Sequence, residues 1–178
     1  LPGRTSAYLV AEGRPQVSGI IQKRLFTEGS RVKAGAVLYQ IDAAPFQAAY
    51  DSALASLARA EAALPAIRSR AERYRESLAS KAVSQQDLDD VESGLRQAEA
   101  EVKVLKAAVQ TARINLGYTR VTAPIAGRIG RSNVPEGALV TAGQPTPLAT
   151  IQQLDPIYVD VPQSTSELLR LKRRMEGG

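Results

Sequence analysis

Apolar and small residues recur at every third or fourth position across residues 46–116 of the chain. The steps alternate between four and three without a break in the first half of this segment, and again in the second half. A seven-residue repeat with two apolar positions is typical of a coiled-coil seam. The seam positions are Phe46, Tyr50, Ala53, Leu57, Ala60, Leu64, Ile67, Ala71, Tyr74 and Leu78, and then Leu88, Val91, Leu95, Ala98, Val102, Leu105, Val109, Ala112 and Leu116.

The two halves are separated by a short stretch at residues 79–84, which predicts an antiparallel return of the chain. An arm of roughly 33 residues is about 50 Å long, so we predict a projecting helical hairpin over residues 46–117 with its tip at about 79–84. Pro65 lies inside the first arm, and because the seam continues on both sides we expect a bend there. The segment Ser84-Gln-Gln-Asp87 resembles a capping box, which predicts Ser84 as the N-cap of the second helix.

The segments on either side of the hairpin repeat one pattern of β-branched residues and glycine turns, at residues 12–45 and 118–153. Leu38 and Ile41 correspond to Leu148 and Ile151, with two extra residues, Thr146-Pro147, inside the second copy. Two such copies predict a small two-sheet sandwich of approximate two-fold symmetry that holds the base of the hairpin. The pairs that share one offset are Val17 and Ile125, Gly19 and Gly127, Ile21 and Ile129, Glu28 and Glu136, Gly29 and Gly137, Val32 and Val140, Ala34 and Ala142, and Gly35 and Gly143.

The outermost segments predict an incomplete third part. Strands are expected at residues 4–11 and 156–161, and a short amphipathic helix at 164–175. These elements are too few to close a sheet, so we expect the chain to be part of a longer protein. The predicted fold is α+β: a split β-sandwich with an inserted antiparallel coiled-coil hairpin, plus an incomplete β portion.

Composition excludes several kinds of chemistry. The chain has no Cys and no His, which rules out zinc sites and acid–base catalysis built on those residues. The net charge of +5 lies on the flanks, without the basic stripe and interleaved aromatics typical of nucleic-acid binding. We find no nucleophile–base pair, carboxylate dyad or phosphate loop. The sequence therefore predicts a non-enzyme without a metal or cofactor, and without a nucleic-acid partner.

Several long segments are similar to one known family, the periplasmic adaptors (membrane fusion proteins) of tripartite RND multidrug efflux pumps. The resemblance implies that the sandwich is a lipoyl-like domain whose half-motifs are residues 12–45 and 118–153. It also implies that residues 1–11 and 154–178 begin a β-barrel domain whose remainder lies outside this chain. The segments are Arg14-Pro-Gln-Val-Ser-Gly-Ile-Ile, Tyr39-Gln-Ile-Asp42, Tyr118-Thr-Arg-Val, Pro124-Ile-Ala-Gly-Arg-Ile-Gly130, Glu136-Gly-Ala-Leu-Val and Gln153-Leu-Asp-Pro-Ile-Tyr-Val-Asp160.

The resemblance further implies a function and partners. Such adaptors link an inner-membrane RND drug/proton antiporter to a TolC-type outer-membrane channel and assemble as a ring, hexameric in the pump. The implied location is the periplasm of a Gram-negative bacterium, with attachment to the inner membrane through an N-terminal lipid anchor that this chain lacks. Neither the exported drugs nor the particular transporter and channel follow from the sequence.

The resemblance also implies that the hairpin tip docks on the channel through Arg73, Leu78 and Ser84. Ser77 stands where the family pattern has leucine, so Leu78 is the candidate apolar anchor. The alternative for Arg73 is a solvated arginine among Arg68, Arg70 and Arg75 near the end of the first helix, where cations favour the dipole. The acidic residues Asp87, Asp89, Asp90 and Glu92 begin the second helix, so the two charged sets are expected to approach each other.

Other functions stay open at this point. The chain is also compatible with an adaptor of an ABC exporter, of a metal-exporting RND pump or of a type I secretion system. A more distant alternative is a lipoyl or biotinyl carrier domain, with Lys33 as the modified lysine. Carrier domains place that lysine on the hairpin that joins the two halves, whereas Lys33 belongs to a repeated turn, matched by Thr141.

Overall fold

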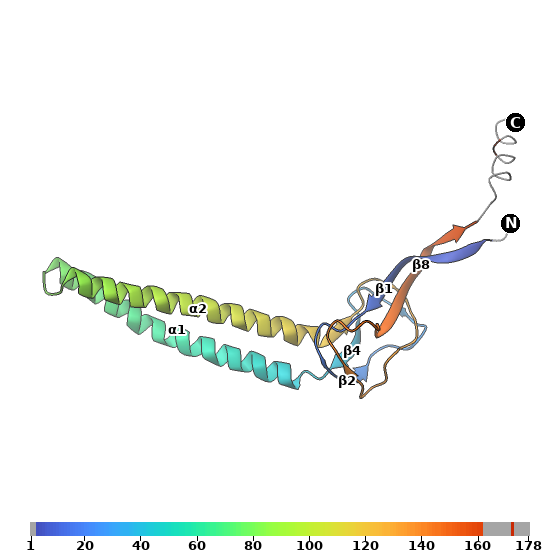
Figure 1. Cartoon of the computed structure of the whole chain (residues 1–178), viewed down its shortest axis with the longest axis horizontal. Helices are drawn as coiled ribbons and strands as arrows, with labels where there is room; N and C mark the ends of the chain where they lie inside the picture. Colours follow the sequence, from blue (N-terminus) through green and yellow to red (C-terminus); the bar gives the residue numbers. More distant parts are fainter. Residues whose placement is uncertain (1–2, 162–171, 173–178) are drawn as a thin grey trace.

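The computed structural model describes residues 3–161 and Lys172 of the chain. A long two-helix rod extends from one side of a small β body, and the ribbon formed by strands β1 and β8 leaves from the other side (Figure 1). The predicted α+β fold with a projecting hairpin is confirmed. The helix expected at residues 164–175 lies outside the described residues, except for Lys172.

The rod consists of α1 (Ala44–Ala79) and α2 (Gln85–Tyr118). Their 36 and 34 residues correspond to about 54 and 51 Å at 1.5 Å per residue. Helix α1 runs without interruption through Pro65. Every predicted seam position is buried or half-buried, which confirms the heptad pattern. The most buried of them are Ala71, Leu88, Leu95 and Val102.

Three ion pairs between the helices lie along one side of the rod. Seven residues forward along α1 correspond to seven residues backward along α2 in each pair, so the register is constant. All six side chains are partly exposed, so each pair contributes little stability and mainly reports the register. The pairs are Glu61 with Lys106 at 2.9 Å, Arg68 with Glu99 at 2.9 Å and Arg75 with Glu92 at 2.7 Å.

The expected approach of the basic and acidic sets is confirmed at the Arg75–Glu92 pair. The prediction that arginines stabilise the C-terminal end of the α1 dipole is wrong, because the last turn of α1 contains no basic residue. The field of a helix end falls off within one turn, and the arginines stop before it.

The β body contains two four-stranded sheets. In the first sheet the order is β1 (Arg4–Gly13), β8 (Ala149–Asp160), β6 (Gly127–Ile129) and β3 (Arg31–Val32). In the second sheet the order is β5 (Arg120–Thr122), β4 (Val37–Ile41), β2 (Gly19–Arg24) and β7 (Leu139–Val140). Each sheet contains strands from both halves of the repeat, so neither half forms a sheet by itself.

The sequence repeat is a structural repeat. Gly29 N–H donates to the carbonyl of Ile129 at 2.9 Å, and the equivalent Gly137 N–H donates to Ile21 at 2.8 Å. The equivalent strands of the two copies also occupy equivalent places in the two sheets. The predicted pseudo-two-fold sandwich is therefore confirmed at the level of individual hydrogen bonds.

The core of the sandwich lies between the two sheets. Tyr39 is its largest fully buried side chain, and its hydroxyl donates to the Leu148 carbonyl at 3.0 Å. The Ser132 hydroxyl lies 2.6 Å from the Tyr39 hydroxyl oxygen, so the buried phenol has two hydrogen-bond partners. The repeated apolar positions supply most of the remaining core, which includes Ile21, Ile41, Ile129, Val140, Leu148 and Ile151.

The hairpin is an insertion between two neighbouring strands. Strand β4 precedes α1, strand β5 follows α2, and the two strands pair antiparallel, with Gln40 opposite Arg120. Ile41 N–H donates to the carbonyl of the buried Thr119 at 2.8 Å, which joins the exit and the return of the chain. The base of the rod is thus held by adjacent strands of one sheet.

Strand β8 continues from the sandwich into a two-stranded ribbon with β1 (Figure 1). We expected a separate strand at residues 156–161, whereas β8 is one strand of 12 residues. Pairing with β1 continues past a register shift between Ala7 and Leu9, so the strand does not end there. Apolar side chains such as Val10, Tyr158 and Val159 are exposed on this ribbon, which is the incomplete β-barrel portion.

Candidate functional site: the hairpin tip

The tip of the rod is a tight turn closed by its own backbone. Lys81 N–H donates to the Leu78 carbonyl and Ala82 N–H donates to the Ser77 carbonyl, both at 2.9 Å. Lys81 adopts a φ of 56°, the left-handed conformation that ends many helices. The hydroxyl of Ser80 donates to the Ser77 carbonyl at 2.9 Å. These bonds satisfy carbonyl groups that the end of α1 would otherwise leave unpaired.

Ser84 begins α2 with the predicted capping box. Asp87 N–H donates to the Ser84 hydroxyl oxygen at 3.1 Å, and Ser84 N–H donates to the Asp87 carboxylate at 3.0 Å. The hydroxyl of Ser84 also donates to that carboxylate, and these hydrogen bonds lower the pKa of Asp87. Ser84 is exposed, so the side chain that caps the helix also lies on the outer surface of the tip.

Arg73 lies on the exposed surface of α1, six residues before the helix ends and so about 9 Å along its axis. No ion pair or hydrogen bond involves its guanidinium within residues 3–161. Its neighbour Arg75 pairs with Glu92, and Arg70 lies 5.6 Å from the ring centre of Tyr74. Of these arginines, Arg73 is the one whose charged group is directed to solvent without such a contact in the described chain.

Leu78 is half-buried in the seam, next to the half-buried Ser77. The structure places Leu78 in the last turn of α1 and Ser84 across the turn at the N-cap of α2, whereas Arg73 lies further down α1. Since Leu78 already packs in the seam, only part of its side chain is available to another molecule.

The contact between Arg70 and Tyr74 was missed by the sequence analysis. Their spacing of four residues places them on one helix face, and this spacing was the available signal.

The tip exposes the polar side chains of Ser80, Lys81 and Ser84 beside the small side chains of Ala79 and Ala82. Within residues 3–161 and Lys172 no group of three or more acidic side chains is placed to hold a metal ion. Such a surface is suited to a shallow contact with another protein, and a contact of this size binds weakly by itself.

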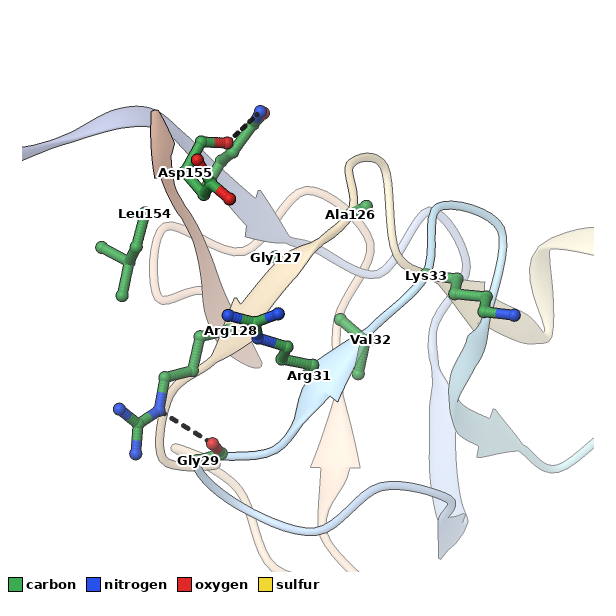
Figure 2. Close-up of a pocket in the computed structure, with 10 residues that line it drawn as sticks. Gly29, Arg31, Val32, Lys33, Ala126, Gly127, Arg128, Leu154 and Asp155 are labelled. Atoms are coloured by element: carbon green, nitrogen blue, oxygen red, sulfur yellow. Dashed lines mark hydrogen bonds between the residues drawn. The ribbon is translucent and has the colours of Figure 1, made fainter. Parts of the chain in front are cut away.

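A recess on the β body is the second candidate (Figure 2). Arg128 crosses it and donates from Nε to the Gly29 carbonyl at 2.8 Å. The recess is open and borders the edge strand β3 and the start of the ribbon. Its lining is formed by Gly29, Arg31, Val32, Lys33, Ala126, Gly127, Arg128, Gln153, Leu154 and Asp155.

Lys33 lies at the rim of this recess, and its side chain is directed away from Arg128 (Figure 2). It is exposed in the turn between β3 and β4, where Ala36 N–H donates to the Lys33 carbonyl at 3.1 Å. The equivalent turn has Gln144 N–H donating to Thr141 at the same distance, so the predicted repeated turn is confirmed. The β4–β5 connection, where a carrier domain places its lysine, is here the whole hairpin.

Within the part of the chain that the structure describes, no helix contains a stretch of 18 residues that is apolar enough to cross a bilayer.

Comparison with known proteins was made with the whole chain. The profile of the family described as "RND MFP, barrel-sandwich hybrid domain" matches residues 10–152. The chain is 58% identical over 178 residues to the multidrug efflux pump subunit AcrA of Escherichia coli K12 and covers 45% of that protein. It is 54% identical over 178 residues to the multidrug resistance protein MexA of Pseudomonas aeruginosa, of which it covers 43%. The chain thus spans less than half the length of these curated relatives.

A solved structure agrees with the sequence matches. A MacA–MexA chimera that contains the α-hairpin domain of Pseudomonas aeruginosa MexA is similar to the chain with a TM-score of 0.61 and 33% identity. The similarity covers 93% of the chain and 56% of the chimera. The profile is named for a barrel-sandwich hybrid domain and the chimera for its α-hairpin domain, which correspond to the two parts of this chain. The chain therefore belongs to the membrane fusion proteins of RND efflux systems.

Proposed function

We propose that the chain is the hairpin-bearing part of a periplasmic adaptor that links an inner-membrane RND drug/proton antiporter to a TolC-type outer-membrane channel. The observation that carries the proposal is the rod itself, a two-helix projection whose tip is exposed and whose base is held between paired strands. The names of AcrA and MexA, a multidrug efflux pump subunit and a multidrug resistance protein, support the same role. The work of such a subunit is mechanical, and the proposal includes no catalysis.

The proposed docking surface is the tip, with Arg73, Leu78 and Ser84 as contact residues. Arg73 offers an exposed guanidinium suited to a carboxylate or carbonyl group on the channel. Ser84 offers a hydroxyl oxygen at the exposed tip, and the exposed part of Leu78 adds a small apolar contact.

One tip buries too little area for tight binding, so the affinity of the assembly comes from several copies acting together. We propose that the adaptors form a ring, hexameric in the full pump, with the sandwiches side by side and the barrel portions toward the transporter. The ring is located in the periplasm and attached to the inner membrane by the full-length protein. The isolated monomeric chain is expected to bind the channel only weakly, and binding at micromolar affinity or tighter would contradict this account.

The test is crosslinking in cells. A photo-reactive or thiol-reactive probe on Ser80→Cys, at the centre of the tip, is expected to capture an outer-membrane channel protein in the envelope. Capture of no envelope protein by a folded, exported adaptor would refute the proposal.

A matched pair of variants tests the role of Arg73. Arg73→Ala is expected to increase drug susceptibility of a strain that depends on this pump, while Arg96→Ala leaves it unchanged. Both arginines are exposed on the rod, but Arg96 lies on α2 well below the tip. Equal effects of the two substitutions would remove Arg73 from the docking surface.

A further inference from the structure

Two arginines lie directly opposite each other on the outer face of the first sheet. Arg31 on β3 pairs with Arg128 on β6, and both side chains line the recess described above (Figure 2). The residues next to them, Val32 and Ile129, pack on the core side, so the arginines face solvent. Opposite side chains in an antiparallel pair have Cβ atoms about 5 Å apart, and like charges at this spacing destabilise the pair.

No ion pair in the described chain neutralises these two charges. Neither Arg31 nor Arg128 forms one within residues 3–161. Glu28, in the turn that precedes β3, is already bound to Arg24 at 2.6 Å and to Ser132 N–H at 3.0 Å. The repulsion between the two guanidinium groups is therefore not relieved by a direct carboxylate contact.

Arg128 is held in a defined position. Its Nε donates to the Gly29 carbonyl at 2.8 Å, which leaves both Nη nitrogens without a hydrogen-bond partner among residues 3–161. Lys33 adds a positive charge at the rim of the recess. Asp155 is the one acidic residue of the lining, so three basic groups against one acidic group give a net charge of +2. The recess therefore offers cationic hydrogen-bond donors, one of which has a fixed orientation.

The internal repeat shows that the fold does not require arginines at these two positions. By the offset of the repeat, Arg31 corresponds to Leu139 and Arg128 corresponds to Ile20. Ile20 and Leu139 are cross-strand partners on β2 and β7, and they are 50% and 74% exposed. The second sheet thus forms the equivalent pair from two uncharged residues, so the facing arginines are a special feature of the first sheet.

Protection of a sheet edge explains only one of the two arginines. Strand β3 is an edge strand, where a charged side chain hinders pairing with another sheet. Strand β6 lies between β8 and β3, so Arg128 is not on an edge. A locally unfavourable pair that the fold does not need is expected at a functional site.

We propose that this recess binds a phosphate monoester group. Such a group has three acceptor oxygens and a charge of about −1.5 to −2 at pH 7, so it matches two facing guanidinium groups. A single carboxylate has half of that charge, and one arginine can hold it as a bidentate pair. The free Nη groups of Arg31 and Arg128 donate to the phosphate oxygens, and Lys33 contributes its charge from the rim.

The recess is large enough for more than the phosphate itself. Its volume is about 640 Å³, and Val32, Ala126 and Leu154 give part of its lining an apolar character. The ligand is therefore expected to carry an apolar portion beside the phosphate. The site lies on the β body, away from the hairpin tip, and it does not depend on the proposed docking to a channel.

The first test measures the unfolding temperature of the full-length adaptor in inorganic phosphate and in sodium chloride of equal ionic strength. Because a ligand that binds only the folded state stabilises it, phosphate should raise the unfolding temperature more than chloride does. Arg31→Gln and Arg128→Gln should lose this difference, while Arg120→Gln, at an exposed position of β5, should keep it. An equal phosphate effect in all the variants would overturn the proposal, because it would reflect general exclusion of phosphate from the protein surface.

The same measurement in chloride separates binding from a structural role. Arg31→Gln removes one of two like charges, so its unfolding temperature in chloride should be unchanged or higher. A clear fall in chloride would show that Arg31 supports the sheet, and it would overturn the proposal.

The second test identifies the source of the phosphate group. Unlipidated full-length adaptor is floated with phosphatidylcholine vesicles that contain or lack phosphatidic acid, whose headgroup is a phosphate monoester. Flotation that requires phosphatidic acid, is lost in Arg31→Gln and is kept in Arg120→Gln would assign the site to a lipid headgroup. Stabilisation by inorganic phosphate without flotation would assign it to a soluble phosphate compound, and the absence of both effects would overturn the site.

Discussion

Glu28 and Glu136 occupy equivalent positions in the two halves of the sandwich, and each carboxylate accepts a hydrogen bond from the backbone of the other half. Glu28 accepts from Ser132 N–H at 3.0 Å and Glu136 accepts from Arg24 N–H at 2.7 Å. Each glutamate therefore joins its own half of the sandwich to the other half through a side-chain hydrogen bond, in addition to the hydrogen bonds between strands. They give the Glu-Gly dipeptides of the repeat a second role beyond the turn.

The Glu28 contact predicts a pH dependence. The hydrogen bond from Ser132 N–H, together with Arg24, lowers the pKa of Glu28 below its ordinary value of 4.5. A carboxyl group with a lowered pKa in the folded state adds stability above its unfolded pKa and loses it as pH falls through the folded pKa. Glu28→Gln is thus expected to weaken the loss of thermal stability below about pH 4.5.

The measurement is the unfolding temperature from pH 7 to 3. Glu101→Gln on the exposed surface of α2 is the control, and it is expected to keep the acid dependence of the unmodified chain. An acid limb that is identical in both variants would show that the Glu28 contact does not contribute.

The buried phenol predicts a cost for the loss of one oxygen. Tyr39→Phe removes one of the two hydrogen bonds that the Leu148 carbonyl accepts, since Asn133 N–H still donates to it at 2.8 Å, and should lower the unfolding free energy by about 1 kcal/mol. Tyr50→Phe on the half-buried seam is expected to change it by less than about 0.5 kcal/mol. Urea denaturation measures the unfolding free energy of both variants. Equal values would show that the hydrogen bond from the Tyr39 hydroxyl does not contribute to stability.

Two glycines predict effects of opposite sign. A Cβ added at Gly35 or at Gly94 meets nothing within 4 Å, so neither substitution clashes. Gly35 has a φ of +80°, where a side chain costs about 1 kcal/mol, and Gly94 is in the middle of α2, where alanine is favoured by roughly the same amount. Gly35→Ala should lower the unfolding temperature and Gly94→Ala should raise it. A common sign would refute the conformational explanation.

The cap predicts a stability change that is separable from docking. Ser84→Ala removes the acceptor of the Asp87 N–H and should destabilise the rod by about 1 kcal/mol. Ser84→Thr keeps a capping hydroxyl and should recover most of this loss. Helix unfolding followed by circular dichroism measures the cap, while tip crosslinking measures docking. A threonine variant that is stable but fails to capture the channel would assign Ser84 a role in contact as well as in capping.

The proline in α1 predicts a stabilising substitution. Pro65 lacks the N–H that would bond to Glu61, and a proline inside a helix costs up to about 3 kcal/mol. Pro65→Ala should therefore raise the unfolding temperature. Unchanged drug efflux in this variant would show that Pro65 is merely tolerated inside the helix, and lost efflux with higher stability would indicate that the rod must flex there.

The parts of the fold that depend on local periodicity could be predicted from the sequence. The seam of the rod, the cap at Ser84 and the two copies of the turn pattern follow from spacing within a few residues. Gly127 belongs to this repeat for a reason that spacing alone does not reveal. A Cβ there would lie 2.5 Å from the Gln152 carbonyl oxygen, so the strands approach too closely for any side chain.

Features that depend on distant pairing could not be predicted in the same way. The exchange of strands between halves, such as the pairing of β2 with β7, joins segments more than 100 residues apart. The continuity of β8 was missed because β1 pairs with it on both sides of residues 154–156, Leu9 with Gln153 and Ala7 with Ile157, across a shift in register that local sequence does not reveal. The partner of Arg73 was not predictable, because a docking surface is defined by a molecule that the sequence does not contain.

The placement of the rod between β4 and β5 separates two properties of the molecule. Gln40 and Arg120 are cross-strand neighbours whether 79 residues or a short loop connect them. The pairing of β4 with β5 at the base of the rod therefore does not depend on what is inserted between them. Whole heptads could be added to or removed from both helices together without changing the register of the seam or the pairing of β4 with β5. The reach of the protein across a gap can therefore evolve independently of the body that anchors it.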